Sequence, residues 1–364
     1  MKEGWEYKKL GEVATIINGK NQKAVENENG KYPICGSGGI MGYATDYLCP
    51  EQTVIVGRKG NINRPIFMEQ KFWNVDTAFG IIANNLFLLP KFLFYFCVDF
   101  NFESLNKAVT IPSLVKSDLL KIQIFLPPLS EQQHIVEELD LLSSIIEKKK
   151  AQLKELDNLA QSIFYEMFGD PVTNEKGWEV KKLGEMGILA RGISKHRPRN
   201  APELLGGTMP LIQTGDIANA DMYINSYHNT YSDLGVAQSK VWKAGTLCIT
   251  IAANIGKCAI LGFEACFPDS VVGFTVDSIF SNNEYIYFIF CRLQSLLERN
   301  APSVAQKNIN LKILNDLQIP LPPLPLQELF ASKIQSIEHQ KALIKQSITE
   351  VETLFNSRMD YYFN

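Results

Sequence analysis

The sequence predicts an α+β fold in which two mixed α/β domains stand in tandem and each is followed by a long helix. Two segments that recur along the chain indicate this. Gly4–Glu12 returns as Gly177–Glu185 with eight of nine residues identical, and Leu126–Leu129 returns as Leu321–Leu324. A long helical pattern follows each Leu-Pro-Pro-Leu segment. Proteins that stack small repeats have periods of about 20–50 residues and at least three copies, so two copies this far apart indicate duplication of a whole domain.

These repeated segments divide the 364 residues into four predicted parts. Domain 1 spans residues 1–129 and is followed by a spacer helix over 130–170; domain 2 spans 171–324 and is followed by a second spacer helix over 325–364. Apolar residues make up 46% of the chain and charged residues 21%, which is typical of globular proteins that bury a sizeable core.

Short β-type runs bounded by turn residues fill both predicted domains. Residues 13–17 and 53–56 of domain 1, and 246–251 of domain 2, are rich in β-branched residues and predict strands. Helical patterns lie near 92–102 and 284–298.

Shorter segments of similar sequence also recur inside the two predicted domains. Gly60–Ile62 corresponds to Ala253–Ile255, and Val75–Thr77 corresponds to Pro268–Ser270, at a common offset of 193 residues. We therefore expect one scaffold that carries different loops in its two copies.

The long helices are predicted from a heptad pattern. After the first Pro-Pro, Ser130 at the N-cap and Gln133 at N3 have the spacing of a capping box. The seam positions, which alternate in steps of four and three, are Ile135, Leu139, Leu142, Ile146, Lys149, Leu153, Leu156, Ala160, Ile163 and Met167. The second seam, 195 residues on, is Phe330, Ile334, Ile337, Lys341, Ile344, Ile348, Val351, Phe355, Arg358 and Tyr362. Two seams in one register indicate that the helices pack on each other, and the non-equivalent seam lysines are of the kind that specifies register.

Cysteine usage and the N-terminus predict a cytoplasmic protein. Seven cysteines form an odd set without Cys-x-x-Cys, which indicates free thiols in a reducing compartment. No secretory signal opens the chain, and the most apolar stretch, Leu86–Val98, is broken by Pro90 and too short to cross a bilayer. The four histidines lack metal-ligand spacing, so no metal site is expected.

The net charge of −3 is unevenly distributed. Residues 1–129 carry 14 basic and 12 acidic side chains, residues 171–324 carry 14 and 13, and residues 130–170 carry 4 and 9. The acidity therefore lies mostly in the first helix. Basic clusters occur at Arg58–Arg64 and Arg191–Arg199. Each by itself could be an ordinary solvated loop, but two clusters in related domains favour contact with nucleic-acid phosphates.

Catalytic motifs are not found in the sequence. Gly36–Gly42 is rich in glycine but lacks the Gly-x-Gly-x-x-Gly spacing, and we interpret it as a loop. The sequence contains neither a Walker A motif nor the Asn/Asp-Pro-Pro-aromatic tetrapeptide of DNA amino-methyltransferases. A nuclease-like Glu179-x-Lys181 has a twin at Glu6-x-Lys8, which favours a packing role for both. These observations favour a binding protein over an enzyme.

The order of these motifs resembles the DNA specificity subunits of type I restriction-modification systems. In each half a Gly-Trp opening, a variable domain, a Pro-Pro-Leu-x-x-Gln stop (Pro127–Gln132 and Pro322–Gln327) and a long helix follow one another, so the resemblance covers essentially the whole chain. It implies two target-recognition domains, each reading one half of a bipartite asymmetric DNA site. It also implies that the helices form an antiparallel coiled coil about a pseudo-twofold axis and set the spacer between the half-sites.

The resemblance further implies partners and cofactors. The expected partners are double-stranded DNA, two methyltransferase subunits and ATP-dependent restriction/translocase subunits, with no membrane. The chain itself is expected to be non-catalytic and to bind no cofactor, because S-adenosylmethionine, ATP and Mg²⁺ are expected on the partner subunits.

Side chains that can read base edges or hold phosphates are the candidate DNA contacts. In domain 1 they are Lys20, Lys23, Arg58, Lys59, Asn61, Asn63 and Arg64. In domain 2 they are Arg191, Lys195, His196, Arg197, Arg199, Gln213, Thr214, Asn254 and Lys257. Two other interpretations stay open: a tandem-domain helical adaptor without a DNA role, and part of a fused restriction-methylation enzyme.

Overall fold

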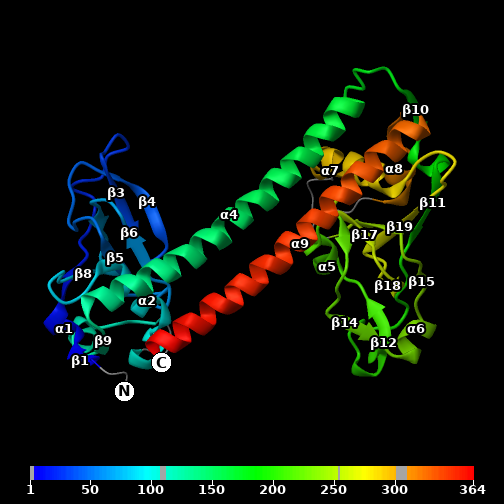
Figure 1. Cartoon of the computed structure of the whole chain (residues 1–364). Helices are drawn as coiled ribbons and strands as arrows, with labels where there is room; N and C mark the ends of the chain where they lie inside the picture. The colour runs from blue at the N-terminus through cyan, green and yellow to red at the C-terminus, as the bar shows by residue number, and fades with distance from the viewer. Residues whose placement is uncertain (1–3, 107–111, 253–254, 301–309) are drawn as a thin grey trace. The chain divides into compact units, whose positions relative to one another are not determined.

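The computed structural model describes residues 4–106, 112–252, 255–300 and 310–364, and it contains two compact units. Unit 1 consists of Met1–Lys150 with Gln346–Asn364, and unit 2 consists of Ala151–Lys345 (Figure 1). Each unit has its own large apolar core. The predicted α+β fold with two mixed domains and two long helices is confirmed.

The two long helices are α4 (Leu129–Phe168) and α9 (Leu324–Phe363), each of 40 residues. Helix α4 begins one residue before Ser130, so the predicted capping box is wrong: Ser130 lies inside the first turn. The carbonyl of Pro128 instead accepts the backbone N–H groups of Glu131 and Gln132. Proline is well placed here, because it cannot donate a hydrogen bond and the first turn of a helix needs none from it.

Buried glutamines explain the Pro-Pro-Leu-x-x-Gln stop. Gln132 is fully buried; its Nε2 donates to the carbonyls of Phe87 and Pro127, and its Oε1 accepts the N–H of Leu89. Its twin Gln327 is also fully buried and donates to the carbonyls of Phe280 and Pro322. One amide side chain thus fastens each helix start to the loop before a shorter helix.

We expect Gln132→Met to destabilise the protein by about 1–3 kcal/mol. The volume is nearly kept, but the Leu89 N–H and the buried Pro127 carbonyl would lose their partner. Urea unfolding of the purified chain measures the change. The exposed neighbour Gln133, which donates to Glu137, provides the control: Gln133→Met should stay within about 0.5 kcal/mol of the wild type. Equal stability of the two variants would contradict this role for the buried amide.

Helices α4 and α9 pack against each other in both units. In unit 1 the ion pairs Arg358–Glu138 (2.7 Å) and Lys150–Glu352 (3.2 Å) join the last part of α9 to the early and middle parts of α4. In unit 2 the ring of Phe330, near the start of α9, lies 5.6 Å from the ring of Phe164, near the end of α4. Early residues of one helix meet late residues of the other, so the pairing is antiparallel.

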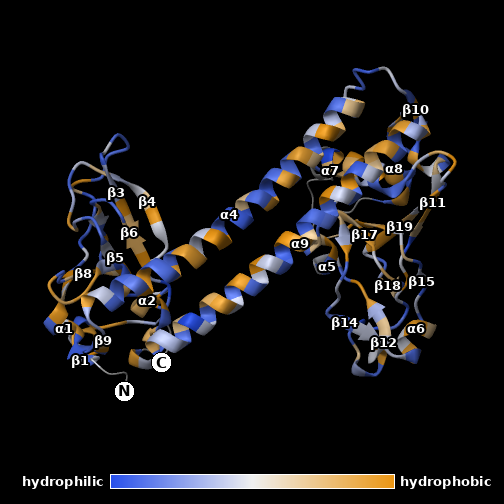
Figure 2. Cartoon of the chain, in the orientation of Figure 1, coloured by the Kyte–Doolittle hydropathy of each residue, from blue (hydrophilic) through white to orange (hydrophobic). Residues whose placement is uncertain are grey.

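None of the predicted seam positions is fully exposed. Those that are buried are Ile135, Leu139, Leu142, Ile146, Ala160, Phe330, Ile334, Ile337, Lys341 and Ile348. Those that are half-buried are Lys149, Leu153, Leu156, Ile163, Met167, Ile344, Val351, Phe355, Arg358 and Tyr362. Figure 2 shows apolar residues recurring along both helices between polar ones.

Lys341 is the buried charge of the seam. Its Nζ lies 2.8 Å from Asp157 Oδ1 on α4 and 2.8 Å from Glu338 Oε1 on α9. Burial alone would lower the pKa of this amine, but the two carboxylates raise it above its ordinary value, so the side chain stays charged.

The sheets of unit 1 occupy the chain before α4. The first is a two-stranded ladder of β1 (Glu6–Lys9) and β9 (Gln123–Leu126). The second has the order β2 (Ala14–Asn18), β8 (Ala78–Ala83), β5 (Thr53–Gly57) and β6 (Ile66–Met68). The third has the order β4 (Gly39–Ala44), β3 (Tyr32–Gly36) and β7 (Trp73–Asn74). The helical segments are α1 (Leu10–Val13), α2 (Pro90–Asp99), η1 (Phe102–Leu105) and α3 (Lys116–Leu119).

Unit 2 has related sheets between the long helices. Its ladder pairs β10 (Glu179–Lys182) with β20 (Gln318–Leu321). A five-stranded sheet has the order β11 (Gly187–Arg191), β19 (Val271–Val276), β16 (Leu247–Thr250), β17 (Cys258–Leu261) and β13 (Tyr223–Ile224). A four-stranded sheet has the order β14 (Asn229–Tyr231), β12 (Leu205–Leu211), β18 (Ala265–Cys266) and β15 (Val241–Trp242). The helical segments are η2 (Leu183–Glu185), η3 (Pro202–Leu204), α5 (Thr214–Asn219), α6 (Asp233–Ala237), α7 (Asn283–Asn300) and α8 (Leu311–Asn315).

The two units share one topology. The order β2-β8-β5-β6 of unit 1 corresponds to β11-β19-β16-β17 of unit 2, to which β13 is added. The repeated opening motif forms β1 and β10, and each pairs antiparallel with the strand before the Pro-Pro stop. Glu6-x-Lys8 and Glu179-x-Lys181 therefore lie in ladders that close each domain.

The interpretation of Gly36–Gly42 as a loop is wrong, because most of it belongs to a β-hairpin. Gly36 ends β3 and pairs with Gly39, the first residue of β4, so only Ser37 and Gly38 connect the strands. Gly39 has a φ of +108°, which glycine adopts readily. Two-residue hairpin connections depend on such backbone freedom, so here glycine is a hairpin signal rather than a loop signal.

Candidate nucleic-acid interface

In unit 1 the predicted basic residues gather at one edge of the sheet. Strands β2 and β5 are each antiparallel to β8, so they run parallel and end at the edge where β8 begins. The segment Asn74–Thr77, just before β8, binds both following loops: the N–H of Lys20 donates to the Asn74 carbonyl (2.8 Å) and that of Arg58 to the Thr77 carbonyl (2.7 Å). We call the loops held by Asn74–Thr77 loop edge 1.

Glycine is required where the first of these loops leaves its strand. A Cβ on Gly19 would lie 1.8 Å from the Val75 carbonyl oxygen, which no side chain can tolerate. In unit 2, a Cβ on Gly192 would lie 2.2 Å from the Phe267 carbonyl oxygen. The same close approach therefore shapes the corresponding loop of each unit.

All seven candidates in unit 1 are exposed residues at loop edge 1: Lys20, Lys23, Arg58, Lys59, Asn61, Asn63 and Arg64. The side chain of Asn63 is in addition engaged within the protein. Its Oδ1 accepts the N–H of Phe102 (2.7 Å) and its Nδ2 donates to Asn101 Oδ1 (3.2 Å). These bonds give Asn63 a role in holding the loop against the chain that follows α2.

Unit 2 has the equivalent edge. Strands β11 and β16 run parallel on either side of β19, and the segment Phe267–Ser270 precedes β19. The N–H of Ile251, just after β16, donates to the Ser270 carbonyl (3.0 Å), as Arg58 does to Thr77 in unit 1. We call the loops around Phe267–Ser270 loop edge 2.

Three of the predicted arginines converge on Asp269. Arg199 Nη2 lies 2.5 Å from Asp269 Oδ1, and Arg197 Nη2 lies 3.6 Å from Oδ2. Arg191 Nε donates to the Asp269 backbone carbonyl (3.1 Å). Two guanidinium groups pair with the one carboxylate and the third binds the backbone of the same residue, so this cluster keeps a positive charge. The sequence singled out Asp269 only as part of the repeated segment Pro268–Ser270 and did not identify it as the partner of the arginines.

The loop that carries Lys195 and His196 is held by Gln238, which sequence reasoning also missed. Gln238 Oε1 accepts the N–H of Lys195 (2.6 Å) and of His196 (3.0 Å). The His196 ring faces Glu203, with Nε2 3.5 Å from Oε1, whereas the Lys195 side chain is exposed. No local sequence signal points to Gln238, because it lies more than 40 residues along the chain.

The remaining candidates in unit 2 lie on neighbouring segments. Lys257 is exposed in the connection between β16 and β17. Gln213 and Thr214 lie at the start of α5, and the N–H of Gln213 donates to Asp216 Oδ2 (2.8 Å). The N–H of Ile212 donates to the carbonyl of Cys266 in β18, which leads directly into Phe267–Ser270. Asn254 lies outside the described residues.

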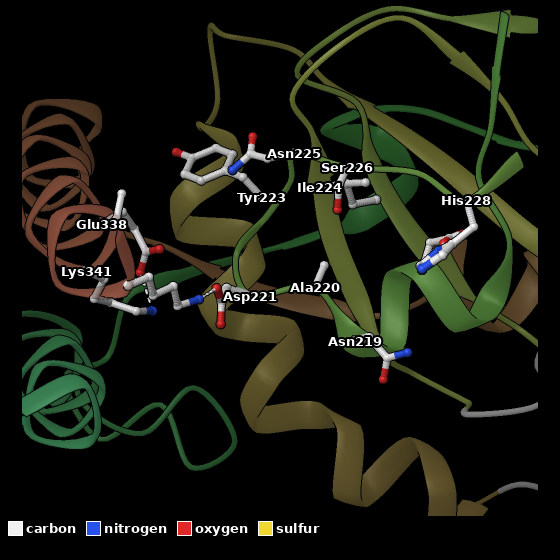
Figure 3. Close-up of a pocket in the computed structure, with 13 residues that line it drawn as sticks. Asn219, Ala220, Asp221, Tyr223, Ile224, Asn225, Ser226, His228, Glu338 and Lys341 are labelled. Carbon is white, nitrogen blue, oxygen red and sulfur yellow. Dashed lines mark hydrogen bonds and ion pairs between the residues drawn. The ribbon is translucent and has the colours of Figure 1, made fainter. Parts of the chain in front are cut away.

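A separate polar pocket of about 380 Å³ in unit 2 is lined by α9, β13 and the segments beside β13 (Figure 3). Its charged groups are paired with one another: Lys341 with Glu338, Lys345 with Asp221, and His228 with Asp216. We assign these pairs a structural role: Lys345–Asp221 joins α9 to the segment before β13, and His228–Asp216 joins the segment after β13 to α5.

Among the described residues, no group of three or more His, Cys, Asp or Glu side chains could hold a metal ion. Within the same part of the chain, no helix is both long and apolar enough to span a membrane.

Comparison with known protein families finds one matching model, for the type I restriction modification DNA specificity domain, over residues 2–157 and again over 175–353. Two similar proteins are the putative type I restriction enzyme specificity subunit S.HindORF215P of Haemophilus influenzae and the putative type I restriction enzyme MjaX specificity subunit of Methanocaldococcus jannaschii. The first is 25% identical over 98% of this chain and 94% of its own length. The second is 22% identical over 96% and 90%.

Solved structures show the same fold. The S subunit of a type I restriction-modification system from M. genitalium aligns with a TM-score of 0.66 at 15% identity, over 98% of this chain and 95% of its own. A chain from a structure of the complex assembly and conformational transition of the type I R-M system aligns with a TM-score of 0.59 at 20% identity, over 100% and 98%.

Proposed function

Since this chain belongs to the type I restriction modification DNA specificity family, whose members bind DNA and act with methyltransferase and restriction subunits, we propose that it reads a bipartite DNA site for such a complex. Loop edge 1 reads one half-site and loop edge 2 reads the other. Helices α4 and α9 set the number of base pairs between the two halves.

The equivalence of the two loop edges supports this proposal most strongly. Both are built around the segment before the matching strand, β8 or β19, and both start from a glycine that no other residue could replace. Their exposed side chains nevertheless differ, with Arg58, Lys59 and Arg64 in one and the arginines around Asp269 in the other. One scaffold with two sets of base-reading side chains suits an asymmetric site.

Catalysis belongs to the partner subunits in this proposal. Two methyltransferase subunits supply the methyl-transfer site with S-adenosylmethionine, and the restriction subunits supply ATP-dependent cleavage with Mg²⁺. The predicted domains are close to neutral, so we expect weak DNA binding by the isolated chain and tight binding by the assembled complex.

Arg58→Ala and Arg197→Ala test the two edges. Each should weaken DNA binding by the reconstituted complex, measured by fluorescence anisotropy over a range of salt concentrations. Loss of a phosphate contact lowers affinity for all sequences and reduces the salt slope by about 1; loss of a base contact costs about 1–3 kcal/mol and relaxes one position of the site.

Lys121→Ala is the matched control for Arg58→Ala. Lys121 is an exposed basic residue of unit 1 that pairs with Asp118 and lies beside α3, near the β1–β9 ladder. This variant should bind DNA as the wild type does. If both arginine variants also bind as the wild type, the basic clusters are not the interface; if the complex binds no DNA at all, the adaptor interpretation is favoured.

A further inference from the structure

The β3–β4 hairpin belongs to loop edge 1, although sequence reasoning left it out of the interface. The N–H of Val75 donates to the Cys35 carbonyl at the end of β3 (3.0 Å). A Cβ added to Gly57, the residue before Arg58, would lie 3.0 Å from the Cβ of Ser37 in the hairpin turn. The turn therefore lies directly beside the basic loop that follows β5.

The hairpin presents large apolar side chains to solvent. Ile40 is 57% exposed and Met41 is 62% exposed, both on β4, which is an edge strand of its sheet. At Gly38 and Gly39 a Cβ would meet nothing within 4 Å, so the tip is narrow and open. Scattered exposed apolar residues need no explanation, but two adjacent ones at a slender tip in the candidate interface do.

The charge around this tip indicates what covers it. Five exposed basic residues share loop edge 1 with the hairpin: Lys20, Lys23, Arg58, Lys59 and Arg64. Residues 36–44 contain no charged side chain. The carboxylates of these loops are Asp76, Glu28 and Glu26, and Glu26 Oε1 would lie 3.8 Å from a Cβ added to Gly42 of β4, so the five basic residues outnumber them. An apolar tip flanked by excess positive charge is complementary to a polyanion that has apolar groups in its grooves.

We propose that the β3–β4 hairpin enters the major groove of the unit 1 half-site and that Ile40 and Met41 contact the 5-methyl groups of thymine. This inference rests on the proposed function. It adds which element of unit 1 contacts the bases, the β3–β4 hairpin, and which base it recognises, thymine. The major groove admits a two-stranded β-ribbon, and thymine is the base that offers a methyl group there. The basic loops beside the hairpin would hold the flanking phosphates.

Unit 2 differs at the corresponding place. Strand β12 corresponds to β3, because each pairs in parallel with the short strand that leads into its loop edge, β18 or β7. A two-residue turn follows β3, whereas α5 and β13 intervene between β12 and its partner β14. The effect of the hairpin should therefore be confined to one half-site.

The test uses the complex reconstituted with its methyltransferase subunits, after its site has been mapped with the wild-type chain. Duplexes in which deoxyuridine replaces each thymine of the unit 1 half-site lack one methyl group at a time. The wild-type complex should lose about four-fold in affinity at one or more positions, the fold-change expected for one buried methyl group. Met41→Ala or Ile40→Ala should lose a similar factor on thymine DNA and nothing further on the matching deoxyuridine duplex.

Leu86→Ala is the matched control. Leu86 is 76% exposed in the same unit but follows β8, at the end of that strand opposite loop edge 1. The complex that contains Leu86→Ala should bind thymine DNA with wild-type affinity. It should also lose as much affinity as the wild type on the deoxyuridine duplexes.

Several results would overturn the hairpin proposal while leaving the proposed function intact. The first is a unit 1 half-site that contains no thymine. The second is wild-type affinity of both hairpin variants in a complex that still methylates its site. The third is that the variants bind the methyltransferase subunit more weakly than the wild type does when no DNA is present. A complex that recognises no DNA site would refute the proposed function and the hairpin proposal together.

Discussion

Replacing residues 1–129 with the corresponding domain of another family member should exchange one half of the recognised DNA site and leave the other half unchanged. Every predicted DNA contact of unit 1, and the hairpin tip, lies between β1 and β9 in the chain. That ladder closes the domain just before the Pro-Pro stop. The exchanged piece therefore carries a complete loop edge, and loop edge 2 keeps all the contacts that shape it.

Mapping of methylated adenines by single-molecule sequencing measures the outcome. The donor domain must present apolar residues to Ile135 and Leu139 of α4 and to Met359 of α9, which belong to the core of unit 1. The reciprocal exchange of residues 171–324 is the control and should change only the other half. A change in both halves, or in neither, would contradict the assignment of one half-site to each domain.

A heptad inserted into both long helices should lengthen the spacer between the half-sites by about two to three base pairs. Seven residues add about 10 Å of helix, and one base pair occupies about 3.4 Å of duplex. The insertions belong near Leu153 in α4 and near Ile348 in α9, close to where the helices pass from one unit to the other. Seven residues preserve the seam, so the antiparallel pairing should persist.

The same methylation mapping reads the new spacer, with both half-site sequences expected to be unchanged. Four residues inserted into α4 alone are the contrasting case, because the seam would turn away from its partner and assembly should fail. If the heptad variant methylated the original spacing with undiminished efficiency, the helices would not set the spacer.

Much of the fold was predictable from local patterns in the chain. The opening motif and the Pro-Pro stop recur, and the structure pairs them in both units as β1 with β9 and β10 with β20. The seams were predictable because a helix returns the same face every three or four residues, whatever lies opposite it. The start of α4 was predicted two residues too late, since a cap depends on where the backbone enters the helix as well as on the residue type.

The candidate site was predictable only in its composition. Basic residues of two clusters do reach loop edges 1 and 2, but Asn63 turned out to hold its own loop, and Asp269 and Gln238 were missed as partners of the arginine-rich loop. The glycine-rich Gly36–Gly42 was interpreted as a loop, although its backbone forms a hairpin.

By itself, the sequence determined that this protein is a duplicated α+β domain with two long heptad helices, because duplication and heptads are repeats along the chain. Only the tertiary structure decided which side chains meet at each edge. Arg191 donates to the backbone of Asp269, and Ser37 in the hairpin turn lies beside Gly57. Both contacts arise because strands that are far apart in the sequence pair side by side. Strand order and direction place loop ends together, and no local pattern of residues encodes that order.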